Sequence, residues 1–132
     1  MFDISHNGRT TFSTTREEAI ALGYPESAIA SAEAGVRKNG AKAECRRRIY
    51  EAASAETQMN MATAAAVISA KEASARTEDE ASILSGLDDA IGWVAQMRAR
   101  VTELADDAAL DIGDDANWPP LPDGARDVVA KF

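Results

Sequence analysis

The chain has 132 residues, a formal net charge of −8 and a sequence pI of about 4.6. Its length suits one domain, and 45% hydrophobic residues exclude wholesale disorder. The acidic balance argues against broad contact with nucleic acid or anionic membranes, and no apolar run approaches the ~20 residues that span a bilayer.

The first residues predict a small β-hairpin. Phe2 and Ile4 alternate with polar residues, and Asn7-Gly8 is a strong two-residue turn signal. An isolated hairpin is marginally stable, so we expect it to pack on a helix or to pair with another chain. The same stretch has no basic or apolar region typical of a signal peptide.

Two short helices are expected after the hairpin. Thr14-x-x-Glu17 and Thr15-x-x-Glu18 are overlapping capping boxes that would open the first helix, and Gly23 would end it. Pro25 fits the first turn of the second helix. Glycine disfavours a helix interior, so we expect the second helix to weaken at Gly35 and to end at Asn39-Gly40.

Residues 41–70 predict one long helix. The stretch contains no proline or glycine and is rich in alanine, glutamate, arginine and glutamine, which are strong helix formers. Its apolar residues follow helical spacing with interruptions at Glu56 and Thr63. They are Cys45, Ile49, Ala52, Ala53, Met59, Ala66 and Val67.

A second long helix is expected over residues 78–108, opened by a capping box of Thr77 and Glu80. Its apolar residues recur at alternating spacings of four and three, a heptad pattern that Leu84 and Ile91 widen toward a core-facing stripe. The two long helices would form an antiparallel hairpin. The heptad residues are Ile83, Leu87, Ala90, Val94, Met97, Val101, Leu104 and Ala108.

Residues 109–132, the C-terminal segment, differ in composition from the helices. We expect an extended stretch around Pro119-Pro120 and a short helix near residues 124–131. The apolar residues of this segment would either fold back on the helices or anchor a partner. The aspartates of residues 106–115 do not fit the spacing of an EF-hand loop, so we predict no metal site.

No catalytic constellation is evident. His6 lies beside a turn, and Cys45 lies in a helical stretch among arginines that could lower the pKa of its thiol. A small packed side chain is the simpler interpretation of Cys45. The sequence has no nucleophile-elbow, P-loop or zinc-protease motif. We therefore predict neither catalytic residues nor a cofactor.

The cluster Arg46-Arg47-Arg48 is the only basic focus. Consecutive arginines point around a helix and cannot form one stripe, and Glu44 and Glu51 lie within pairing distance. We predict a solvated or partner-facing surface here and no nucleic-acid contact.

Several polar, methionine and tryptophan residues are candidates for partner binding. Methionine fills irregular gaps, tryptophan is enriched in binding hot spots, and polar groups in an apolar neighbourhood can fix the register between subunits. The candidates are Gln58, Met59, Asn60, Met61, Trp93, Met97, Trp118, Pro119 and Phe132.

The stretches AECRRRIYEAASAETQMNM and GWVAQMR resemble small tail-fibre-associated and tail-fibre assembly proteins of bacteriophages and prophages. The similarity covers about residues 41–100 and the later Trp118-Pro119. It implies a non-enzymatic role beside a trimeric tail fibre, in the virion tail or in the host cytoplasm during assembly. The matching residues are Arg47, Arg48, Ile49, Gln58, Asn60, Met61, Trp93, Val94, Met97 and Arg98.

The sequence therefore predicts a mainly α protein: a long antiparallel helical hairpin (41–108), an N-terminal region with a small β-hairpin and two short helices (1–40), and a C-terminal segment (109–132). The expected function is binding of a phage tail-fibre or baseplate protein, as a homo-oligomer or in a hetero-complex. The alternative is an acidic inhibitor or decoy that binds a basic host protein, motivated by the net charge and the aspartate cluster.

Overall fold

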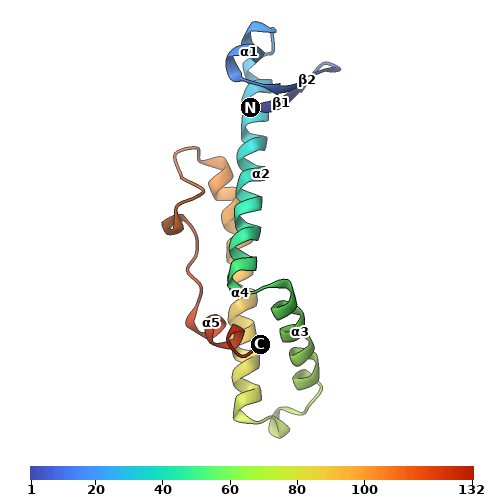
Figure 1. The fold of residues 1–132 in the computed structure, drawn as a ribbon, viewed down its shortest axis with the longest axis vertical. Helices are drawn as coiled ribbons and strands as arrows, with labels where there is room; N and C mark the ends of the chain where they lie inside the picture. Colours follow the sequence, from blue (N-terminus) through green and yellow to red (C-terminus); the bar gives the residue numbers. More distant parts are fainter.

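The computed structural model describes all residues from 1 to 132 and confirms the mainly helical fold class (Figure 1). None of its helices combines the length and the apolar character that a membrane span requires. Two short 3-10 turns lie at Ala73–Ala75 and Asp115–Asn117. The elements are β1 (Phe2–His6), β2 (Arg9–Thr14), α1 (Arg16–Ala21), α2 (Glu26–Ala52), α3 (Ala55–Ser69), α4 (Glu78–Asp106) and α5 (Asp123–Val129).

The predicted β-hairpin is confirmed and packs on α2. β1 and β2 pair antiparallel, and the turn residues Asn7 and Gly8 have φ angles of 50° and 78°. Positive φ at both turn residues matches the right-handed twist of the strands. Phe2 and Ile4 form a small core with Ile29 of α2. The hairpin therefore covers one end of α2, which is the first of the two outcomes that the sequence left open.

Helix α1 begins and ends where the sequence indicates. Thr15 forms a reciprocal capping box with Glu18, whereas Thr14, of the overlapping candidate, is buried and donates from Oγ1 to the same glutamate. Gly23, with φ +84°, lies just past the helix end. A left-handed conformation there suits glycine because it has no Cβ.

The expected end of the second helix at Asn39-Gly40 is wrong. α2 is a single helix of 27 residues that runs through Gly35 and Gly40, across the expected boundary between residues 40 and 41. Two glycines cost about 1 kcal/mol each relative to alanine. Packing offsets that cost, because the hairpin covers the N-terminal part of α2 and α4 covers its C-terminal part.

The expected continuous helix over residues 41–70 is also wrong. The chain leaves the helix at Ala53, whose φ of −149° and ψ of 118° are extended, and α3 starts anew. Ser54 caps α3 by accepting a hydrogen bond from the Thr57 N–H. Gln58 Nε2 donates to the Ala53 carbonyl oxygen over 2.8 Å and satisfies a group that the break exposes. Ser54 is the sequence signal for this break, since serine favours the N-cap position.

α4 is the central helix of the fold, and its predicted capping box of Thr77 and Glu80 is confirmed. α2 lies antiparallel along its C-terminal half, where Arg37 Nε donates to the Ala105 carbonyl oxygen over 3.1 Å. α3 and α5 contact its N-terminal half (Figure 1). The central core between α2 and α4 is built from Ala41, Cys45, Trp93, Met97, Val101, Leu104 and Trp118.

The C-terminal segment folds back on the helices. Trp118 is buried in the central core and donates from Nε1 to the Ile112 carbonyl oxygen over 2.7 Å. Trp93 Nε1 donates to the Pro119 carbonyl oxygen over 2.9 Å. The predicted terminal helix is present as α5, and its Val128 is buried against α4. The apolar residues of this segment are therefore largely used within the chain.

Three glutamates have pKa values below the ordinary glutamate range, because each accepts hydrogen bonds that favour its charged form. Their carboxylates cap helices or pair with cations on the surface. The largest cause is the Thr15 backbone N–H for Glu18, Arg47 for Glu44 and Lys71 for Glu80.

We expect the protein to lose stability in acid through these groups. A folded-state pKa below the unfolded value of ~4.3 means that the unfolded chain binds more protons near that pH. The stabilisation is therefore present above pH ~4.3 and is lost as the pH falls through the lower folded-state values. Urea unfolding between pH 7 and pH 3 measures it.

The triple substitution of Glu18, Glu44 and Glu80 by glutamine should flatten this pH dependence. A matched triple variant should keep the wild-type slope, because its carboxylates make no hydrogen bond. An equal slope in both triple variants would contradict the assignment. The matched substitutions are Glu17→Gln, Glu56→Gln and Glu72→Gln.

Candidate functional site

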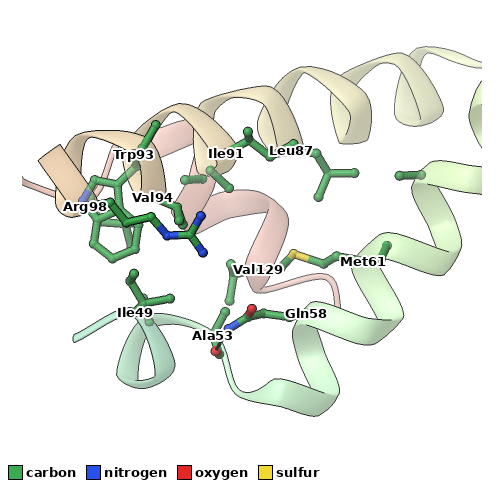
Figure 2. A pocket seen from close by; sticks show the side chains of 17 residues that line it. Ile49, Ala53, Gln58, Met61, Leu87, Ile91, Trp93, Val94, Arg98 and Val129 are labelled. Atoms are coloured by element: carbon green, nitrogen blue, oxygen red, sulfur yellow. Dashed lines mark hydrogen bonds between the residues drawn. The ribbon is translucent and has the colours of Figure 1, made fainter. Parts of the chain in front are cut away.

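An apolar cleft lies between the α2–α3 corner and α4, and we call it the α3–α4 cleft (Figure 2). Its volume is about 440 Å³, and fifteen of its seventeen lining residues are hydrophobic. α3 supplies Met61, Ala62 and Ala65, and α4 supplies a longer row that includes Leu87 and Ile91. The alanines of α3 fill little of the space toward α4, so a hollow remains between the two helices.

The cleft also depends on α5. Ala125 and Val129 line it beside residues of α4. Gly86 of α4 lies against α5 so closely that a Cβ there would sit 2.7 Å from Val128 Cβ. Because Gly86 has no side chain, α5 can pack directly against α4, and this packing forms one wall of the cleft.

One large apolar side chain of the cleft lining is mostly exposed. Ile91 lines the cleft and is 68% exposed, which corrects the expectation that it faces the core. Trp93 takes the inward position instead and packs in the central core. Outside the cleft lining, Met59 and Val67 of α3 are 70% and 60% exposed. Both residues were expected on the apolar face of one continuous helix over residues 41–70. Because α3 begins as a separate helix after Ser54, different side chains face inward.

Two polar side chains line the cleft, Gln58 and Arg98. The Gln58 amide nitrogen is bound to Ala53, so its position is fixed by the chain break. Arg98 makes no hydrogen bond and no ion pair within the chain, and Figure 2 shows its guanidinium group among the apolar side chains around the cleft. An unpaired guanidinium group at the edge of an apolar cleft can donate hydrogen bonds to an anionic group of a ligand.

The structure separates the nine residues predicted to bind a partner. Met97 and Trp118 are buried in the central core, where they contact other parts of the same chain, and we retain neither as a contact residue. Gln58, Met61 and Trp93 line the cleft. The others lie outside it: Met59 and Asn60 are exposed on α3, Pro119 accepts the Trp93 hydrogen bond, and Phe132 is 37% exposed at the end of the chain.

Ile91, Leu87 and Val129 line the cleft but were not predicted as site residues. Leu87 belongs to the predicted heptad pattern and Ile91 widens it, so both read as core positions. Ser54 signals the start of α3, but nothing in the local sequence shows that α5 packs beside the cleft. The cleft arises from the way three separate segments meet.

Cys45 is a core residue. Its thiol is buried in the central core, and burial raises the pKa of that thiol against the opposing effect of the Arg98 charge. Burial therefore outweighs the effect of the nearby arginine charge, which is the opposite of the activation that the sequence suggested. The simpler interpretation, a small packed side chain, fits the structure.

His6 lies in β1, at the N-terminal end of the fold, whereas Cys45 lies in the central core. His6 is not one of the residues of that core. It shares a shallow hollow with Asp3, Ser27 and Ser31, a proximity that the sequence did not suggest. No hydrogen bond joins the imidazole to these side chains; Asp3 instead accepts from the Ser13 N–H over 2.8 Å.

The predicted pairing of the arginine cluster with nearby glutamates is confirmed. Arg47 binds Glu44 and Glu51, and Arg48 binds Glu44 over 2.8 Å. Arg48 also binds Asp115 and lies over the Trp118 ring, 5.4 Å from its centre. Arg47 thus pairs within α2, whereas Arg48 also fastens the C-terminal segment to α2.

The aspartates of residues 106–115 stabilise their own loop. Asp107, Asp111 and Asp114 each accept a hydrogen bond from a backbone N–H two residues ahead, a common turn arrangement. The structure contains no group of histidine, cysteine and carboxylate side chains arranged to hold a metal ion.

The sequence matches no protein-family profile and no curated protein. Within the structure the α3–α4 cleft has the most apolar lining, and Ile91 in that lining is largely exposed.

Proposed function

We propose that this chain is a non-enzymatic structural or assembly protein of a bacteriophage tail, and that it binds a tail-fibre or baseplate protein through the α3–α4 cleft. The observation that carries the proposal is the open apolar cleft, whose rim leaves Ile91 largely exposed. Exposed apolar surface of this kind is typical of protein-binding sites.

The form of the cleft favours a helical or extended segment of a partner. The cleft runs between two helices, and helix-in-groove recognition uses apolar anchors spaced along one face of the bound helix. A third helix between α3 and α4 would cover the side chains that the chain leaves open. The tail-fibre context comes from the resemblance of the Arg47–Ile49, Gln58–Met61 and Trp93–Arg98 stretches, and it implies a location in the virion tail or in the host cytoplasm during assembly.

The second candidate function is an acidic inhibitor or decoy of a basic host protein. The net charge of −8 favours it. Salt distinguishes the two candidates, because binding driven by opposite charges weakens steeply as ionic strength rises, whereas apolar contact largely persists.

Substitution of Ile91 by glutamate should weaken binding to the tail-fibre protein of the same phage or prophage at least about tenfold, since it places a charge in an apolar contact. Co-expression followed by affinity purification and titration of the purified pair measures this. Ile91 is largely exposed, so the variant should melt at the wild-type temperature.

The matched control is Val36→Glu on α2. Val36 is 48% exposed and lies outside the cleft, so its substitution makes the same kind of change at a different surface. The control should bind as the wild type does. Equal loss in both variants, or unchanged binding by Ile91→Glu, would exclude the cleft as the binding site.

A further inference from the structure

The cations of this chain divide into those with a partner inside the chain and those without one. Most pair with a carboxylate or donate to a backbone carbonyl, as Arg47, Arg48 and Arg100 do. Four form neither an ion pair nor a hydrogen bond. They are Lys38, Lys42, Arg46 and Arg98.

These four unpaired cations line one hollow, which we call the basic trough. Its volume is about 510 Å³, and no carboxylate lies among its lining residues. Lys38, Lys42 and Arg46 follow one another at intervals of four on α2, so they share one face of that helix. Arg98 faces them from α4. In the sequence the basic focus is the cluster 46–48 with Arg37 and Lys42 upstream, and the stripe with Lys38 and Arg98 was not predicted.

The basic trough adjoins the α3–α4 cleft. Both hollows include Ile49, Gln58, Val94 and Arg98 in their lining. Tyr50 extends the floor of the trough, and Arg46 lies over its ring, 5.0 Å from the centre. A ligand in the cleft therefore meets Arg98, and it reaches Lys38, Lys42 and Arg46 when it extends into the trough.

We infer that the occupant of the cleft and trough is an amphipathic helix of a partner protein that carries carboxylates along the flank facing α2. The inference rests on the proposed function, since it names the chemistry of the segment bound at the same site. Four like charges held close together repel one another, and an anionic flank on the ligand would compensate them. The apolar face of the same helix would occupy the cleft.

The shape and the charge of the site decide between this occupant and others. Both hollows are open along one side, whereas a small carboxylate ligand usually has 70–90% of its surface buried by its pocket. A second copy of this chain carries the same net charge of −8, so two copies repel each other at long range. A short acidic helix carries far less negative charge than a second copy of the chain, and its carboxylates can pair with the four cations of the trough.

The test uses two synthetic amphipathic peptides of about 18 residues, identical except for glutamate or lysine beside the leucine face. Fluorescence anisotropy measures their binding to the full chain. The glutamate peptide should bind on the order of tenfold more tightly at low ionic strength. The ratio should shrink as salt is added, because ion pairs at a solvent-exposed groove are screened.

Two charge-reversal variants separate the trough from the net charge. The double substitution Lys42→Glu with Arg98→Glu should reverse the preference between the peptides. Arg126→Glu with Lys131→Glu changes the net charge equally at residues outside both hollows, and it should keep the wild-type preference. The same response in both double variants would overturn the inference.

The remaining outcomes distinguish this inference from the proposed function. Equal binding of both peptides, weakened by Ile91→Glu, would overturn the charge assignment and leave the cleft as a protein-binding site. Binding of the tail-fibre protein through the cleft with neither peptide bound would do the same. A preference for the lysine peptide, displacement of the peptide by dodecanoate, or self-association that blocks the peptide would each overturn the acidic-helix assignment.

Discussion

Replacement of Trp118 by alanine should lower the free energy of unfolding by about 3–5 kcal/mol. The indole closes the central core beside Met97, and its Nε1 donates to the Ile112 carbonyl oxygen over 2.7 Å. The substitution removes the buried area, opens a cavity and releases the segment that leads to α5. Urea unfolding followed by the fluorescence of Trp93, which remains in the same core, measures the change.

Phe132→Ala is the matched control. Phe132 is also an aromatic residue of the C-terminal segment, but it is 37% exposed and belongs to none of the core clusters. Its substitution should cost less than about 1 kcal/mol. A wild-type unfolding midpoint for Trp118→Ala would show that the C-terminal segment contributes nothing to the fold, contrary to its buried contacts.

Gly86→Ala should lower the free energy of unfolding by about 1–3 kcal/mol, although alanine is the better helix former. A Cβ at Gly86 would lie 2.7 Å from Val128 Cβ and 2.8 Å from the Gly124 carbonyl oxygen. Both contacts involve α5, and the second is with backbone, so the clash can be relieved only by moving α5 away from α4. Thermal unfolding monitored by circular dichroism measures the loss.

The same helix offers a control in Gly92→Ala. A Cβ at Gly92 meets no heavy atom within 4 Å, so only the backbone preference changes. This substitution should stabilise the protein by about 0.5–1 kcal/mol. If both glycine variants were stabilised, the close packing of α5 on α4 would be refuted.

Short-range signals in the sequence identified the turns and the helix starts. Asn7-Gly8, the capping boxes at Thr15 and Thr77, and Gly23 all act through atoms within a few residues, so their effect can be read locally. The predicted helix end at Gly40 was wrong because the free-energy cost of glycine in a helix is smaller than the stabilisation from the contacts that α2 makes at both ends. Local preference gives way where tertiary packing decides.

The candidate site could not be predicted in the same way. The helix break at Ala53 has a local signal in Ser54, but the cleft also depends on the packing of α3 and α5 against α4, which joins segments far apart in the sequence. Missing the break made Met59 and Val67 look like core residues. The basic trough was partly readable, since Lys38, Lys42 and Arg46 are spaced by four, but Arg98 joins them only through the α2–α4 packing.

Because Trp118 is part of the central core, that core cannot be completed during translation until the C-terminal segment has been synthesised. Cys45 of α2 is synthesised about 70 residues earlier, and at ~5–20 residues per second the ribosome needs roughly 4–15 s to reach the indole that completes the core. Until α4 has been made the nascent α2 carries an uncovered face, and the core then stays incomplete until Trp118 follows. The central core is thus completed late in synthesis, whereas the β-hairpin and its contacts with Ile29 can form early.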